Sequence, residues 1–101
     1  MKLNYSPFRN GTIISKKLNN GIMLVSFNQN SRKSPTAYLL EESSVDIWKL
    51  IDGKHDIKKI INCLSYKYDA SNDKIRNFVF DFLKKLEREK IILFKKEDDS
   101  R

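Results

Sequence analysis

A change of hydrophobic period at Ser43 constrains this chain more than any other feature. Before it, apolar residues form short runs with β character at 12–17, 22–27 and 36–40. After it, apolar residues recur every three or four positions, the spacing of one face of an α-helix. Strands that all precede helices predict an α+β domain with a three-stranded antiparallel sheet followed by three helices.

The first two runs are predicted to form a β-hairpin. Asn20 and Gly21 lie between them, and an Asn-Gly pair supplies the two positive-φ positions that a tight two-residue turn requires. A polar loop at 28–35 then leads to the strand at 36–40. Pro35 has no N–H group to donate, so it marks the start of this strand and indicates an edge position in the sheet.

Capping signals place the first two helices. Ser43 followed by Asp46 predicts a capping box at the start of the first helix, and Gly53 is expected to end it. Asp56 is the expected N-cap of the second helix. The apolar face of that helix is formed by Ile57, Ile60, Ile61, Leu64 and Tyr68.

The third helix is expected to open at Ser71 or Asn72 and carries a continuous apolar stripe. The stripe comprises Ile75, Phe78, Val79, Phe82, Leu83 and Leu86. Phe80 falls outside it, which favours Phe80 as a contact for a partner. A short strand at 91–94 follows. The predicted organisation is an N-terminal arm at 1–11, a domain at 12–94 and a charged flexible tail at 95–101.

Composition limits the chemistry of the chain. Cys63 is the only cysteine and His55 the only histidine, so no internal disulfide is possible and we expect neither a metal site nor a cofactor. The sequence has no nucleophile–base pair and no phosphate-binding glycine loop, which argues against an enzyme. Trp48 is expected in the core, and Cys63 is expected to act as a small buried hydrophobe.

Charge and hydropathy indicate the kind of partner and the compartment. The formal net charge is +7, and residues 1–40 hold six Lys or Arg with no acidic residue. This excess favours an anionic partner. No apolar run approaches the roughly 20 residues of a membrane helix, and the start lacks an apolar signal segment, so we expect a cytoplasmic protein without membrane contact.

The segment 38–92 carries a spaced pattern that resembles a known family. Its residues are Trp48, Leu50, Asp52, Gly53, Ile57, Ile60, Ile61, Tyr68, Val79, Phe82, Leu83 and Leu86. With the strands before it, this order is similar to the PqqD-like family of peptide-recognition domains in ribosomal-peptide modification pathways. Phe78 and Lys90 depart from the family pattern, which often has an acidic residue and a glycine at these two places.

The resemblance implies a winged helix-turn-helix fold and a function without catalysis. Family members bind the leader segment of a precursor peptide as an added strand, between the third strand and the third helix, and present it to an enzyme. Carried over to this chain, the peptide-binding residues would be Thr36, Ala37, Tyr38, Leu39, Leu40, Lys74, Phe78, Phe82 and Lys85. Phe78 and Phe82 are also typical of core positions. Arg32, Lys33 and Lys84 would add to a basic surface that favours an acidic leader.

Several alternatives stay open at this point. The separate partner would be a radical enzyme, a cyclodehydratase or the leader peptidase of a lasso-peptide pathway. The chain would be a monomer or an edge-strand dimer, and either face of the strand at 36–40 could meet the ligand. A winged-helix DNA-binding regulator is the alternative function, since fold and charge both suit nucleic acid. Asp81, Glu87 and Glu89 on the third helix would face phosphates poorly, which makes a nucleic-acid partner the less favoured reading.

Overall fold

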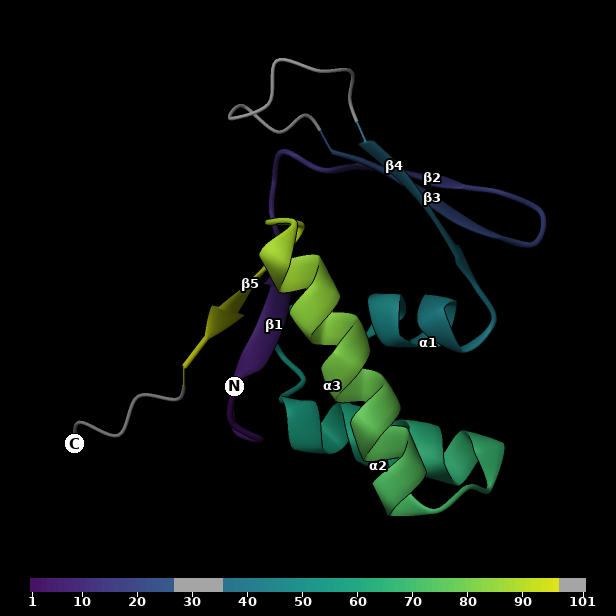
Figure 1. Cartoon of the computed structure of the whole chain (residues 1–101), viewed down its shortest axis with the longest axis vertical. Coiled ribbons are helices and arrows are strands. Elements are labelled where there is room, and N and C mark those ends of the chain that lie inside the picture. The colour runs from purple at the N-terminus through teal and green to yellow at the C-terminus, as the bar shows by residue number, and fades with distance from the viewer. Residues whose placement is uncertain (27–35, 97–101) are drawn as a thin grey trace.

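The computed structural model describes residues 1–26 and 36–96, so the predicted loop at 28–35, Arg32, Lys33 and the end of the tail lie outside the described residues. The described chain forms two small sheets and three helices (Figure 1). In chain order the elements are β1 (Ser6–Arg9), β2 (Ile14–Lys17), β3 (Gly21–Ser26), β4 (Thr36–Glu41), α1 (Ser43–Lys49), α2 (Ile57–Tyr68), α3 (Asn72–Arg88) and β5 (Ile92–Lys95).

The larger sheet is the predicted three-stranded antiparallel sheet, with the strand order β2-β3-β4. β4 pairs with β3 over six residue pairs, from Gly21 opposite Glu41 to Ser26 opposite Thr36. The prediction of an edge position for this strand is therefore confirmed, since among the described residues β4 has a neighbouring strand on one side only.

The hairpin turn between β2 and β3 differs from the prediction. Asn19 and Asn20 form the turn, and the Leu18 N–H donates to the Gly21 carbonyl at 2.8 Å. Neither asparagine has a positive φ, so the expected Asn-Gly turn with two positive φ values is wrong. Gly21 is instead the first residue of β3, where its missing side chain leaves room for the carbonyl group of Leu40.

The core lies between the larger sheet and the helices, which are all on one side of it (Figure 1). Leu24 and Leu40 contribute from the sheet, while Ile47 and Trp48 contribute from α1. Trp48 is 2% exposed, as expected for a core residue. Among residues 1–26 and 36–96, no helix combines the length and the apolar character that crossing a membrane requires.

The starts of the helices are only partly as predicted. The Asp56 side chain accepts from the Lys59 N–H at 2.8 Å, and Ser71 caps α3 in the same way. The capping box at Ser43 is wrong, because Glu42 is the N-cap, with φ 53° and no side-chain cap. The chain leaves β4 for α1 through this positive-φ residue, whose carbonyl accepts from the Val45 and Asp46 N–H groups.

The expectation that Gly53 ends α1 is wrong, because the helix stops at Lys49 with Leu50 as its C-cap. Gly53 has φ 81°, a backbone region that glycine adopts at little cost. Its N–H donates to the Pro7 carbonyl at 2.8 Å. The glycine therefore serves the junction between the α1–α2 loop and the N-terminal segment.

The N-terminal segment contains a strand that the sequence analysis missed. β1 pairs antiparallel with β5, from Ser6 opposite Lys95 to Arg9 opposite Ile92. The carbonyls of Leu3 and Tyr5 accept from the Lys58 and Ile57 N–H groups, which are unpaired donors in the first turn of α2. The N-terminal segment is thus hydrogen-bonded to α2 and β5. The limits of the domain at 12–94 stay a prediction.

Three side chains lie elsewhere than expected. Cys63 is exposed, not buried. Phe80 is partly buried against the core, with the Arg76 guanidinium 5.8 Å from its ring centroid, and its contact with a partner stays a prediction. Tyr68, expected on the apolar face of α2, is 40% exposed at the end of the helix.

Replacement of Gly21 tests how closely β3 and β4 approach each other. A Cβ atom at this position would overlap the Leu40 carbonyl group, whereas a Cβ at Gly11 would meet no atom within 4 Å. We expect Gly21→Ala to lower the free energy of unfolding by about 1–3 kcal/mol, as overpacking does. Gly11→Ala is the matched control and should change it by less than about 0.5 kcal/mol. Urea unfolding measures both; equal effects would show that the close approach is not limiting.

Candidate functional site

The free edge of β4 offers unpaired backbone groups. In an antiparallel pair, alternate residues bond to one neighbour and the residues between them point to the other side. Because the Leu18 N–H bonds to the Gly21 carbonyl, the backbone groups of Gly21 point toward β2, and those of Ile22 and Leu24 point toward β4. Leu40 and Tyr38, which lie opposite these two residues, therefore bond toward β3. The N–H and C=O groups of Ala37 and Leu39 therefore point away from the sheet, along the free edge.

The two faces of β4 are now distinguished, a choice that the sequence left open. Tyr38 is partly buried and Leu40 is 5% exposed, and both pack toward the helices. Leu39 is 55% exposed, and Ala37 is exposed on the same outer face. A strand added to this edge would send alternate side chains toward α3 and toward the outer face of the sheet.

The two edges of the larger sheet differ in chemistry. β2, the opposite edge, has the sequence ISKK, with the exposed residues Lys16 and Lys17. β4 has the sequence TAYLLE and contains no lysine. Lysines on an edge strand discourage pairing with a further strand. β4 is therefore the edge that is open to a partner strand.

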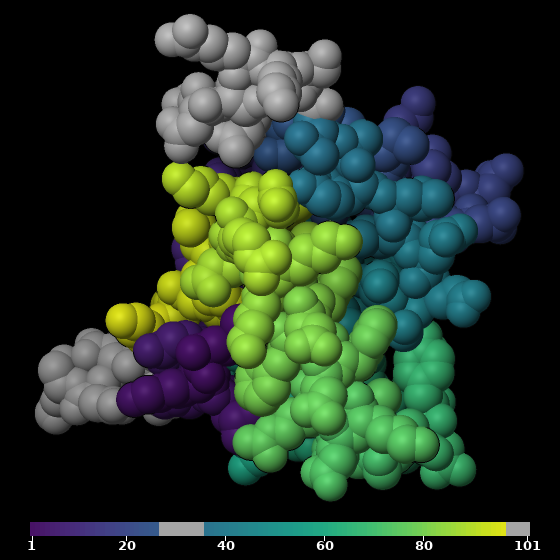
Figure 2. All heavy atoms as spheres, viewed as in Figure 1, coloured from purple at the N-terminus to yellow at the C-terminus, as the bar shows by residue number. Residues whose placement is uncertain are grey.

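One stripe of α3 borders β4. Phe78, Phe82 and Lys85 lie 11, seven and four residues before Glu89, spacings that place them on one helix face. Burial of the Tyr38 phenol and its hydrogen bond to the Glu89 carboxylate raise the pKa of Tyr38 to about 12. This contact places the C-terminal end of the stripe beside β4. The two elements are neighbours on the face drawn in Figure 2, α3 in green to yellow-green and β4 in blue.

Phe78 and Phe82 form an aromatic pair on this stripe. Their rings stack with centroids 6.5 Å apart and planes 10° from parallel. Phe82 packs against the core, as expected, whereas Phe78 is 39% exposed. Phe82 thus packs between the core and the ring of Phe78, and the exposed side of Phe78 is the apolar surface that a peptide side chain could cover.

The structure brings most of the predicted residues together, but not all of them. Thr36 to Leu40 lie in β4, and Phe78, Phe82 and Lys85 lie on one stripe of α3. Lys74 lies in the first turn of α3, 15 residues before Glu89, or about 22 Å along the helix at 1.5 Å per residue. Lys74 is also four residues before Phe78, one turn away on the same side of the helix, so it stays a predicted peptide-binding residue at the far end of the stripe.

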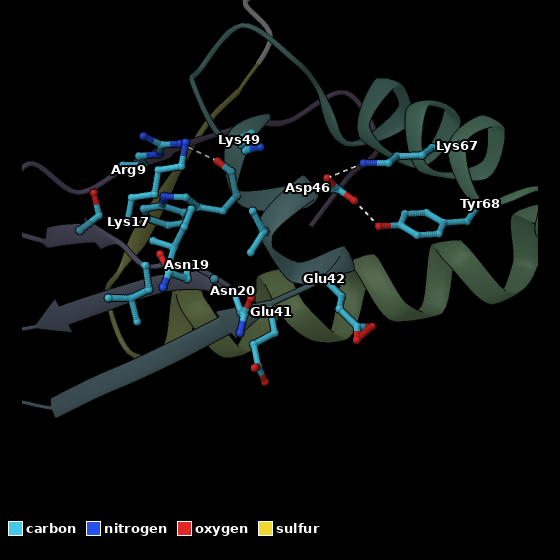
Figure 3. Close-up of a pocket in the computed structure, with 16 residues that line it drawn as sticks. Arg9, Lys17, Asn19, Asn20, Glu41, Glu42, Asp46, Lys49, Lys67 and Tyr68 are labelled. Atoms are coloured by element: carbon cyan, nitrogen blue, oxygen red, sulfur yellow. Dashed lines mark hydrogen bonds and ion pairs between the residues drawn. The ribbon is translucent and has the colours of Figure 1, made fainter.

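A second candidate location is an open hollow of about 940 Å³ beneath the β2–β3 turn (Figure 3). Basic and acidic side chains mix around it, with Arg9, Lys17, Lys49 and Lys67 beside Glu41, Glu42 and Asp46. Arg9 is engaged, since it donates to the Trp48 carbonyl at 2.7 Å and lies 4.4 Å from the ring centroid of that residue. The described residues hold no group of acidic, His or Cys side chains that could bind a metal ion.

Asp46 joins α1 to α2 at the side of this hollow. Its carboxylate accepts from the Lys67 ammonium at 2.8 Å and from the Tyr68 hydroxyl (Figure 3). Partial burial alone would raise the pKa of Asp46, but these hydrogen bonds outweigh it and hold the pKa below the ordinary 3.8. Asp46, expected to close a capping box, instead holds two helices together.

Comparisons with known proteins agree with this architecture. Residues 27–92 match the family described as Coenzyme PQQ synthesis protein D (PqqD). The fold is similar to the solved structure "TbiB1 in Complex with the TbiA(beta) Leader Peptide", with a TM-score of 0.70 and 16% sequence identity over 91% of this chain and 99% of that chain. The curated proteins yield no match. The predicted family resemblance and the α+β fold are thus confirmed.

The Asp46 contacts should make stability depend on pH. The carboxylate's folded pKa lies below its ordinary value of 3.8, so its contribution is complete above that value and is lost as pH falls through the folded pKa. We expect Asp46→Asn to cost about 1 kcal/mol at neutral pH and almost nothing at about pH 2. Urea unfolding at both pH values measures this. Tyr68→Phe, which keeps the Lys67 pair, should cost less; an equal Asp46→Asn loss at both pH values would contradict the assignment.

Proposed function

This chain belongs to the PqqD family, and we propose that it binds the leader segment of a ribosomally made precursor peptide as a strand added to the free edge of β4. The observation that carries the proposal is the open edge of β4, whose N–H and C=O groups at Ala37 and Leu39 point away from the sheet, together with the exposed aromatic pair on α3. Main-chain hydrogen bonds supply affinity in strand addition, and side-chain pockets supply specificity. The solved relative in fold, TbiB1, is itself a complex with a leader peptide, which supports the proposal.

The proposed site combines backbone pairing with one apolar contact and one charge. Ala37 and Leu39 would pair with the leader backbone, and a leader side chain that points toward α3 would cover Phe78. Lys85 lies on the same stripe, exposed, and would favour an acidic residue in the leader. Such a surface charge speeds association more than it adds affinity, and salt screens it.

The chain would act with a separate protein. A bound leader has one edge paired to β4 and leaves the rest of the precursor peptide free for modification elsewhere. We propose that the chain is not an enzyme and presents the leader to a peptide-modifying enzyme or a leader peptidase. The DNA-binding alternative predicts mobility shifts of duplex DNA at physiological salt, which we do not expect.

Proline substitution at the free edge tests strand addition directly. Ala37→Pro removes an outward N–H donor without breaking a bond to β3, and proline is tolerated at such edge positions. We expect the affinity for a synthetic leader of the neighbouring precursor gene to fall at least about tenfold, while the fold is kept. Isothermal titration calorimetry measures the affinity.

Ser15→Pro is the matched control for Ala37→Pro. Ser15 has the equivalent outward position on β2, by the same alternation of the ladder. It should bind the leader like the wild type. Equal losses in both variants would point to a general effect on the sheet and would contradict binding at β4.

The aromatic contact is tested separately. Phe78→Ala should weaken leader binding about three- to tenfold, because the leader loses one apolar contact of about 1 kcal/mol. Tyr66→Ala is the control, since Tyr66 is 91% exposed on α2, an element that takes no part in the site. Amide NMR titration of the labelled protein should place the largest shifts on β4 and α3. If Phe78→Ala binds like the wild type, the leader does not reach this stripe.

A further inference from the structure

The side of the larger sheet that faces away from the helices is apolar at its centre and carries the charged residues Lys16 and Glu41. We name it the outer sheet face and define it by Ile14, Met23, Val25, Ala37 and Leu39. The strand register aligns these residues in two rows that cross all three strands. One row is Ile14, Val25 and Ala37, and the other is Lys16, Met23 and Leu39.

Nothing among the described residues packs this face into the core. The partly buried residues that pack on the core include Ile22 and Tyr38 from the inner face, but neither Met23 nor Val25. Ile14 and Leu39 are each 55% exposed. Contiguous exposed apolar patches mark interaction sites in soluble proteins.

The outer sheet face is continuous with the proposed leader site. Both rows end at β4, with Ala37 and Leu39, whose backbone groups point to the free edge. A leader strand paired there would place alternate side chains beside these two residues, because side chains alternate across a strand. The bound leader would therefore lengthen both rows by one residue.

We propose that the outer sheet face is the docking surface for the separate peptide-modifying enzyme, which contacts the chain and the bound leader together. The inference rests on the proposed leader binding and adds to it the place where the enzyme docks. The matching surface of that enzyme is apolar, with an acidic side chain opposite Lys16, the only basic residue in the two rows. The enzyme would then contact one four-stranded surface, formed by the three strands of the chain and the bound leader.

Size favours this occupant over a second copy of the chain. Three strands spaced about 4.8 Å apart and about 20 Å long span roughly 300 Å² of sheet surface. A stable protein–protein interface buries about 800 Å² on each partner. The outer sheet face alone is too small for a stable dimer. A leader strand paired to β4 adds about 100 Å² to the surface that an enzyme can contact, and the enzyme completes its interface on the leader itself. Binding of the enzyme should therefore strengthen when the leader is present.

The test compares two neighbouring positions of β2, an element away from the leader edge. Ile14 points to the outer sheet face, and Ser15 is exposed on the opposite face. The enzyme encoded in the same gene cluster is immobilised, and full-length Ile14→Asp and Ser15→Asp are passed over it with and without a leader peptide that lacks the core segment. Biolayer interferometry reports affinity, and calorimetry reports leader binding by the chain alone.

We expect Ile14→Asp to bind the enzyme at least tenfold more weakly than the wild type and Ser15→Asp to stay within twofold. Both should bind the leader like the wild type. Equal enzyme affinity in the two variants would overturn the proposal, as would sedimentation showing that Ile14→Asp only dissociates a dimer of the chain. If Ile14→Asp does not fold, Ile14→Ser replaces it. A wild-type chain that binds the enzyme but no leader would instead refute the proposed function.

Discussion

The packing of the inner face of β4 onto the helices is the constraint on which the rest of the site depends. Leu40 enters the shared core, and Tyr38 meets Glu89 at the end of α3. Because side chains alternate along a strand, burying these two residues fixes Leu39 and Ala37 on the outer face. The same packing sets the distance from β4 to the aromatic stripe of α3, so one set of buried contacts defines both the ligand edge and its apolar wall.

Local patterns in the sequence predicted the elements that build the site. β-branched and aromatic runs marked β3 and β4, and helical spacing marked α3, since both patterns repeat the geometry of the element itself. Pro35 indicated the edge position of β4 for a similar reason, because a missing donor is a local property. The Asp56 and Ser71 caps were predictable too, as a cap depends only on the first turn of its own helix.

Features that depend on distant residues were not predictable from the sequence. β1 lies in a short segment with no strand pattern of its own, and its partner β5 is about 85 residues further along the chain. The N-cap of α1 is Glu42, because the direction of the chain from β4 into the core overrides the preference for Ser43. Gly21 resembled a turn residue, yet a carbonyl on β4 is what requires it. The face of β4 that is free also depends on the packing of the helices.

The geometry divides recognition between two kinds of contact. A strand edge pairs with any extended backbone, so the Ala37 and Leu39 amides cannot tell one leader from another. Discrimination must come from leader side chains that point toward α3, where Lys74, Phe78 and Lys85 are the exposed residues of the stripe. So few contacts can exclude few leader sequences. A site built this way requires an extended leader with one suitable apolar residue, and it leaves finer selection to whatever protein covers the outer sheet face.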